Sequence, residues 1–175
     1  MASKLDQLPI ELRLQILSFL DPADLWLSVR HINNRYRDYA EEIIAKELIP
    51  RFTVGLNFTL SSGSHHRWYD VRGTVHHSFK HISKLNPQYA LFEVDTVLPE
   101  DFQDRVLETW KRMCASGFGV EQEWRVTYAG TGLLMKMPSN VVSGTDGVWC
   151  DWRELMDNWL MRLPQIWDGL ARPFA

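Results

Sequence analysis

The spacing of apolar residues changes once along this 175-residue chain, and the change divides it into two parts. Up to Pro50 the apolar side chains recur every three or four residues, which is the period of an α-helix. From Arg51 they alternate with polar residues, as in a strand that is buried on one face only. The sequence therefore predicts two units of different architecture, residues 1–50 and residues 51–175.

The first expected helix carries more apolar surface than a small domain can bury by itself. On a helical wheel with Ile10 at zero, Leu14 and Leu17 lie near zero. A second apolar group covers an arc from roughly 180° to 280° and comprises Leu12, Ile16, Phe19 and Leu20. A helix that is apolar on two sides needs a partner on each of them. One partner can be its own domain, and the other side indicates contact with a second protein.

Two further helices are expected before Pro50. Asp21-Pro22 predicts a helix start, because the carboxylate can accept from first-turn amides and proline already has a helical φ angle. A third helix has one apolar side running from Ile32 to Leu48, and Pro50 ends it.

The order of residues in this part is similar to that of a known family. Leu8-Pro9 is followed by Glu11-Leu12, Ile16-Leu17, Phe19-Leu20, Asp21-Pro22-Ala23-Asp24-Leu25, Val29-Arg30, Ile32-Asn33, Arg35-Tyr36-Arg37 and Ala40. This ordered set resembles the F-box, a three-helix module that docks onto a Skp-type adaptor in cullin-based ubiquitin ligases. The chain departs from the common pattern by one extra residue between Leu25 and Val29 and by Trp26, where a medium aliphatic residue is usual.

The resemblance implies a non-catalytic substrate-receptor subunit of such a ligase, with the adaptor, and through it a cullin, as partners. Residues from about position 51 onward would then select the target protein. The docking residues that it implies are Leu8, Pro9, Leu12, Ile16, Leu17, Leu20, Leu25, Val29 and Ile32. Two alternatives stay open: an F-box protein that uses its adaptor outside ubiquitin transfer, and a self-contained binding domain whose helices only cap a sheet.

The second part of the chain predicts an α+β fold, namely a mainly antiparallel sheet of about five strands with two helices packed on it. The expected strands are Phe52–Leu60, Tyr69–His81, Tyr89–Val97, Trp124–Tyr128 and Leu133–Met137. Gly73 is expected to mark a bulge in the long second strand. One helix should begin after Pro99 and the other at Asp151, with a loop before Gly147. The second part of the chain has none of the repeat periods that are typical of kelch, leucine-rich or WD repeats.

A basic band lies in the middle of an acidic chain. Residues 51–88 carry five Lys or Arg against one acid, a net charge of +4, whereas the segments before and after carry −2 and −5. The mixture of basic and aromatic groups favours an acidic or phosphorylated peptide as the target, and the predicted binding residues are Arg67, Trp68, Tyr69, Arg72, His76 and Trp149. Single-stranded nucleic acid would suit the same groups, but the net charge of −3 argues against it.

No catalytic residue, cofactor or metal site is predicted. The chain has no G-x-S-x-G elbow and no phosphate-binding loop ending in Gly-Lys. His77 and His81 are expected on one face of a strand, but about 13 Å apart, which is too far for one metal ion. Cys114 and Cys150 fit no metal spacing. Trp110 and Trp159 are expected in the core, because they fall on the apolar sides of their helices.

The sequence predicts a reducing compartment, the cytosol or the nucleus, and no membrane partner. The segment MASKLDQLP lacks the apolar stretch of a secretion signal. No run approaches the roughly eighteen apolar residues of a membrane-spanning helix. Two distant cysteines do not form a disulfide framework, so both thiols are expected to be free.

Overall fold

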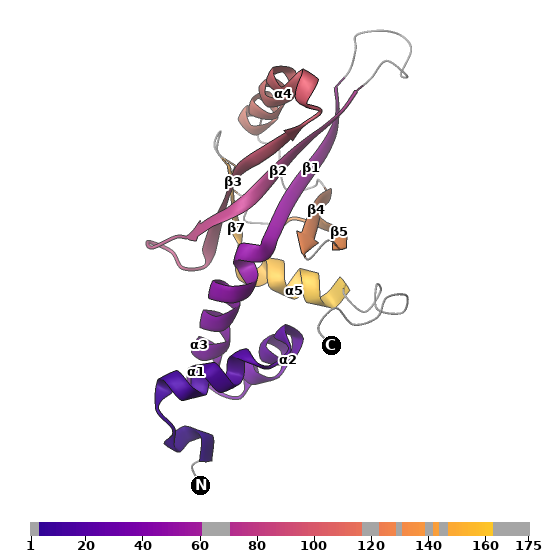
Figure 1. Ribbon diagram of the computed structural model, residues 1–175. Helices are drawn as coiled ribbons and strands as arrows, with labels where there is room; N and C mark the ends of the chain where they lie inside the picture. Colours follow the sequence, from indigo (N-terminus) through magenta and orange to yellow (C-terminus); the bar gives the residue numbers. More distant parts are fainter. Residues whose placement is uncertain are drawn as a thin grey trace. The chain divides into compact units, whose positions relative to one another are not determined.

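A computed structural model describes residues 4–60, 71–116, 123–128, 131–138, 142–143 and 147–162 (Figure 1). The chain divides into two compact units, Met1–Pro50 and Arg51–Asp168. The division falls where the apolar period changes. None of the helices in the described ranges combines the length and the apolar character that crossing a bilayer requires.

The first unit is helical throughout. Its three α-helices are α1 (Ile10–Ser18), α2 (Pro22–Leu27) and α3 (Asn34–Ile43). Short 3-10 turns cover Lys4–Gln7, Val29–His31 and Ile49–Arg51, and a π-helical turn, Ile44–Leu48, continues α3. The buried side of α3 and this turn consists of Tyr36, Tyr39, Ala40, Ile43, Ile44 and Leu48, as the helical period predicted.

Side-chain caps define where α2 and α3 begin. The Asp21 carboxylate accepts a hydrogen bond of 2.7 Å from the Ala23 amide, with Pro22 in the first helical position, which confirms the predicted start of α2. Asn33 caps α3 in the same way by accepting from the Tyr36 amide at 3.1 Å. Ile32 therefore lies before α3 rather than on its apolar side, and it is exposed.

The second unit is an antiparallel sheet with two helices, so the predicted mixture of helix and sheet is confirmed. The sheet has the strand order β5-β4-β1-β2-β3-β7-β6 within the described residues (Figure 1). Its strands are β1 (Phe52–Leu60), β2 (Val71–Ile82), β3 (Tyr89–Leu98), β4 (Glu123–Tyr128), β5 (Thr131–Lys136), β6 (Val142–Ser143) and β7 (Gly147–Asp151). A 3-10 turn (Glu100–Phe102) leads into α4 (Gln103–Ala115), and α5 is Trp152–Arg162.

Both helices of the second unit cover the same face of the sheet. Trp159 of α5 packs its indole 5.0 Å from the Phe52 ring of β1, measured between ring centroids. Trp110 of α4 packs in the same way 5.2 Å from His77 of β2 and 6.0 Å from Trp124 of β4. The prediction that Trp110 and Trp159 belong to the core is confirmed, because both are almost fully buried.

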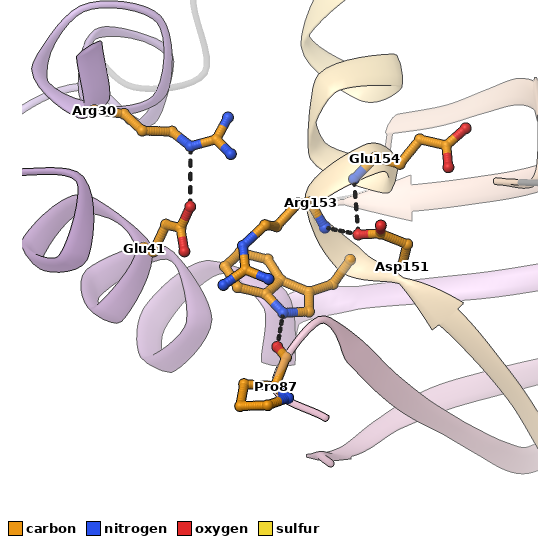
Figure 2. Close-up of polar contacts among 7 residues, drawn as sticks. Arg30, Glu41, Pro87, Asp151, Arg153 and Glu154 are labelled. Atoms are coloured by element: carbon orange, nitrogen blue, oxygen red, sulfur yellow. Dashed lines mark hydrogen bonds and ion pairs between the residues drawn. The ribbon is translucent and has the colours of Figure 1, made fainter. Parts of the chain in front are cut away.

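Helix α5 begins without a loop after β7. The Asp151 carboxylate accepts from the amides of Arg153 at 2.9 Å and Glu154 at 3.2 Å, which confirms the predicted helix start (Figure 2). The Trp152 indole N–H donates to the Pro87 carbonyl at 2.8 Å and ties α5 to the turn between β2 and β3. At the other end of α5, Arg162 Nη1 donates to the Leu134 carbonyl of β5 at 3.0 Å.

The prediction of about five strands was too low. Within the described residues, β6 lies in the stretch that was expected to be a loop before Gly147, and β7, for which no strand was predicted, pairs with β3 from Gly147 opposite Glu93 to Asp151 opposite Tyr89. Gly147 lies so close to the Phe92 carbonyl that any side chain would collide with it. The lack of a side chain at Gly147 therefore permits β7 to pair with β3 here.

The bulge predicted at Gly73 was also wrong. Gly73 pairs regularly with Phe58, and a Cβ there would lie 3.0 Å from the Phe58 ring and 3.3 Å from Val106 of α4. The pairing of β2 with β3 instead shifts between His76 and His77 and between Phe79 and His81. The second shift places His81 opposite Leu91, on the face away from the helices, whereas His77 stays in the core.

His77 should make the second unit sensitive to acid. Its Nδ1 lies 3.1 Å from the Val54 carbonyl and therefore donates to it, and its Nε2 has no hydrogen-bond partner in the described part of the chain. Burial is the main cause that lowers the pKa of His77 to about 4. Between pH 6.5 and 4 the unfolded chain then binds the proton more readily, so stability falls as the pH falls. The expected loss between about pH 7.5 and pH 5 is about 2 kcal/mol.

Denaturant unfolding at the two pH values, followed by tryptophan fluorescence, measures this loss. The variant His77→Phe should show a much weaker pH dependence, whatever its absolute stability. Phe79→Leu, in the same strand, changes the packing without removing a titratable group and should keep the wild-type pH dependence. An unchanged pH dependence in His77→Phe would contradict the assignment.

Candidate functional site

Helix α1 has an inner and an outer apolar side, as the helical wheel predicted, except that Ile10, expected on the inner side, is 47% exposed. Leu17 is buried and Leu14 half-buried on the side that packs toward α3. Leu12, Ile16 and Leu20 are 45%, 46% and 39% exposed on the other arc. No described residue covers these three side chains enough to bury them, so this side of α1 presents an apolar surface to solvent.

More large apolar side chains of the same unit are exposed. Phe19, which follows α1, is 82% exposed, and Leu27 and Ile32 are 57% and 62% exposed. We call the set Leu12, Ile16, Phe19, Leu20, Leu27 and Ile32 the apolar docking set. Single exposed apolar residues are ordinary on protein surfaces. Six within twenty-one residues are not, and such concentrations mark sites of protein contact.

The predicted docking residues fall into two groups. Leu12, Ile16, Leu20 and Ile32 are exposed, Pro9 is exposed, and Leu8 is half-buried. Leu17, Leu25 and Val29 are at most 8% exposed, so in this structure they form the core of the chain instead of its surface. The sequence-based set omitted Ile10, Phe19 and Leu27, which are exposed. The wheel already placed Phe19 on the outer arc, so that signal was present.

Arg13 holds α1 in place. Its Nε donates to the Leu8 carbonyl at 2.7 Å, and its Nη1 donates to the Tyr39 hydroxyl of α3 at 3.3 Å. The guanidinium thus joins the segment before α1 to α3, and it fixes which side of α1 faces inward. Leu12 and Ile16, the members of the apolar docking set that lie on α1, are consequently presented by a helix of defined orientation.

Trp26, at the position where the chain departs from the F-box pattern, is a core residue. It is 1% exposed, and the Arg30 guanidinium lies over its ring, 4.1 Å from the centroid. Arg30 Nε also forms an ion pair of 3.1 Å with Glu41 of α3 (Figure 2). These contacts fix the register of α2: Leu25 and Trp26 point inward, and Leu27 points outward.

The second candidate surface is the face of the sheet away from α4 and α5, which we call the open face. Arg72 and His76 of β2 lie on it, opposite Thr59 and Gly55 of β1. Trp149 of β7 is half-buried and pairs with Leu91 of β3. Its ring contacts that of His81 at 5.5 Å between centroids. Arg67, Trp68 and Tyr69 lie outside the described residues.

The structure thus brings Arg72 and His76 together on one strand, while Trp149 lies two strands away. Sequence reasoning missed Arg125 of β4, which pairs with Gly55 and so lies in the same row across the sheet as His76. The local sequence around Arg125 does not indicate that it lies in the same row as His76, because only the pairing of both strands with β1 brings β2 and β4 together.

Metal ligands and a reactive thiol were sought in the described ranges. No group of three or more His, Cys, Asp or Glu side chains there could hold a metal ion. His77 and His81 lie on opposite faces of the sheet, which corrects the expectation that they share one. Neither Cys114 nor Cys150 takes part in a disulfide, and burial is the main cause that raises the pKa of Cys150 above its ordinary value.

Comparison with known proteins adds no identification. No protein-family model matches the chain, and no curated protein or solved structure is significantly similar to it.

The exposed apolar side chains predict dye binding. The full chain should enhance the fluorescence of a hydrophobic dye such as bis-ANS while circular dichroism shows it folded, because the apolar docking set faces water. Leu12→Asp combined with Ile16→Asp should lower this signal. Gln15→Asp puts the same charge on the polar side of α1 and should leave it unchanged. Equal dye fluorescence in all three proteins would mean that α1 is covered in solution.

The two thiols should differ in reactivity. A disulfide reagent such as Ellman's should label Cys114, which is half-exposed, and leave Cys150 unlabelled until the protein unfolds, because the reactive thiolate is disfavoured by burial. Cys114→Ser should abolish labelling of the native protein, and Cys150→Ser should not change it. Rapid labelling of native Cys114→Ser would show that Cys150 is accessible.

Proposed function

We propose that this protein is a substrate-receptor subunit of a Skp–cullin–F-box ubiquitin ligase. The observation that carries the proposal is the apolar docking set, which is exposed on the same helical unit whose residue order resembles the F-box. The first unit would bind a Skp-type adaptor and, through it, a cullin. The second unit would hold the target protein. Such a complex would act in the cytosol or the nucleus.

The exposed residues are adequate for a specific complex. Burying one large apolar side chain contributes about 1.5 to 3 kcal/mol, so a few of the six could supply the affinity left after association costs are met. The residues buried in the chain have a different role under this proposal. Leu17, Leu25 and Val29 would keep the helices in register while their exposed neighbours make the contact.

The receptor performs no bond chemistry under this proposal. It raises the effective concentration of a target beside a ubiquitin-loaded conjugating enzyme, because both are held in one assembly. Under this proposal the chain therefore needs two separate binding surfaces, one for the adaptor and one for the target protein. The apolar docking set lies in the first unit and the open face in the second.

Co-purification with a Skp-type adaptor tests the docking surface. Leu12→Asp or Ile16→Asp should reduce adaptor binding at least tenfold, since each places a charge in a contact that would exclude water. Gln15→Asp is the matched control and should bind like the wild type. Circular dichroism checks that each variant is folded. Adaptor binding that survives both substitutions would overturn the docking assignment.

The same purification separates ligase use from other uses of an adaptor. A cullin should be recovered together with the adaptor and this chain, and Leu12→Asp should remove both. Recovery of the adaptor without any cullin would favour a role outside ubiquitin transfer.

A further inference from the structure

The open face has an unusual row of residues across three central strands. His76 of β2 and Arg125 of β4 both pair with Gly55 of β1, so two long side chains flank a position that has none. A Cβ at Gly55 would lie 2.9 Å from His76 Nδ1, which shows that the imidazole leans over the bare backbone of β1. Glycine inside a strand often marks the close approach of another backbone.

Polar groups surround this row. Thr53 of β1 lies opposite Ser78 and Thr127, and the next residues along the same face are Asn57 and Thr74. Both α4 and α5 pack on the other face, so neither of these helices covers these side chains. The open face therefore presents hydroxyl groups, one amide and basic groups, which are spaced as side chains are on neighbouring strands of a sheet.

Positive charge is available on this face, and one of the two nearby acids of β3 is neutralised by an ion pair. Arg72 and Arg125 are exposed, and neither takes part in an ion pair within the described ranges. The acids of β3 have partners: Glu93 forms an ion pair of 3.0 Å with Lys80, and Asp95 accepts from the Ser78 hydroxyl at 3.1 Å. An incoming anion would thus meet uncompensated cations.

We propose that the open face binds an anionic, extended peptide segment over Gly55, with Arg72, His76 and Arg125 as its main contacts. The inference rests on the proposed function in one respect, namely that the peptide belongs to the protein to be ubiquitinated. The anionic groups are carboxylates or phosphates, which accept hydrogen bonds from guanidinium and imidazole N–H groups. Because the His76 ring lies across Gly55, it is the group that a peptide crossing β1 would meet there.

The spacing of the three basic residues suits a peptide in extended conformation. Arg72 and His76 are four residues apart along β2, about 13 Å, and His76 and Arg125 are two strand spacings apart, about 10 Å. Side chains on the same side of an extended peptide are about 6.6 to 7 Å apart. Acidic groups four positions apart, which lie on the same side of the peptide, would therefore reach Arg72 and His76 together.

Fluorescence anisotropy with labelled degenerate peptide pools tests the proposal. The pools differ only at fixed positions, which hold phosphoserine, glutamate, serine or lysine. The full chain should bind the phosphoserine or glutamate pool at least tenfold more tightly than the lysine pool, and added salt should weaken the binding. Comparison of these two pools with the serine pool shows whether phosphate or carboxylate is the preferred anion.

Matched variants locate the binding surface. Arg72→Ala with Arg125→Ala should weaken binding of the anionic pool at least tenfold. Lys111→Ala with Arg112→Ala removes the same charge from exposed positions of α4, on the other side of the sheet, and should bind like the wild type. Gly55→Val should also weaken binding, because the added side chain would displace the His76 ring. Equal affinity in the two double variants, or no preference for anionic pools, would overturn the proposal.

Two further experiments distinguish this proposal from the alternatives. Single-stranded RNA that binds the wild-type chain more tightly than every peptide pool would overturn it in favour of nucleic-acid recognition. The peptide measurement is repeated with Leu12→Asp and Ile16→Asp in the full chain, which should keep peptide affinity. Peptide binding without adaptor binding would overturn the proposed function alone, and adaptor binding without peptide binding would overturn this inference alone.

Discussion

An antiparallel sheet with one apolar face has to be covered on that face, and this requirement determines the arrangement of the second unit. Phe52, Val54 and Leu56 of β1 are buried, while the residues between them pair with polar neighbours on the open face. Helices α4 and α5 meet the requirement with Trp110 and Trp159. Because both helices pack on the apolar face, the polar side chains of the open face stay outside the core.

The first unit has the opposite property, since its three short helices do not cover all of their own apolar surface. The interior includes Trp26, over which Arg30 lies, and Arg13 connects α1 to α3. These contacts give the unit its internal order. They leave the apolar side chains of the outer arc of α1 exposed to water. This exposure is unfavourable in free energy for the isolated protein, and binding of an apolar partner removes it.

Features that depend on neighbouring residues were predictable from the sequence. Asp21 and Asp151 cap helices as their spacing indicated, and β1 alternates as its residues do. Features that depend on distant pairing were not. Strand β7 exists because β3 supplies its partner, His81 changes face because the pairing shifts beside Lys80, and Arg125 joins His76 only through β1. The F-box motif by itself placed buried Leu17 in the docking set and left exposed Phe19 out, although the helical wheel had put them on different sides.

The hydrogen bond from Arg162 to the Leu134 carbonyl affects whether two copies of the protein can pair through their edge strands at high concentration. β5 is an edge strand, and edge strands offer main-chain groups with which a strand of another molecule can pair. A guanidinium on one of those carbonyls occupies an acceptor that such a strand would need, and it adds a positive charge that repels a second copy. The β5 edge of the sheet is thereby less able to pair with a strand of a second copy.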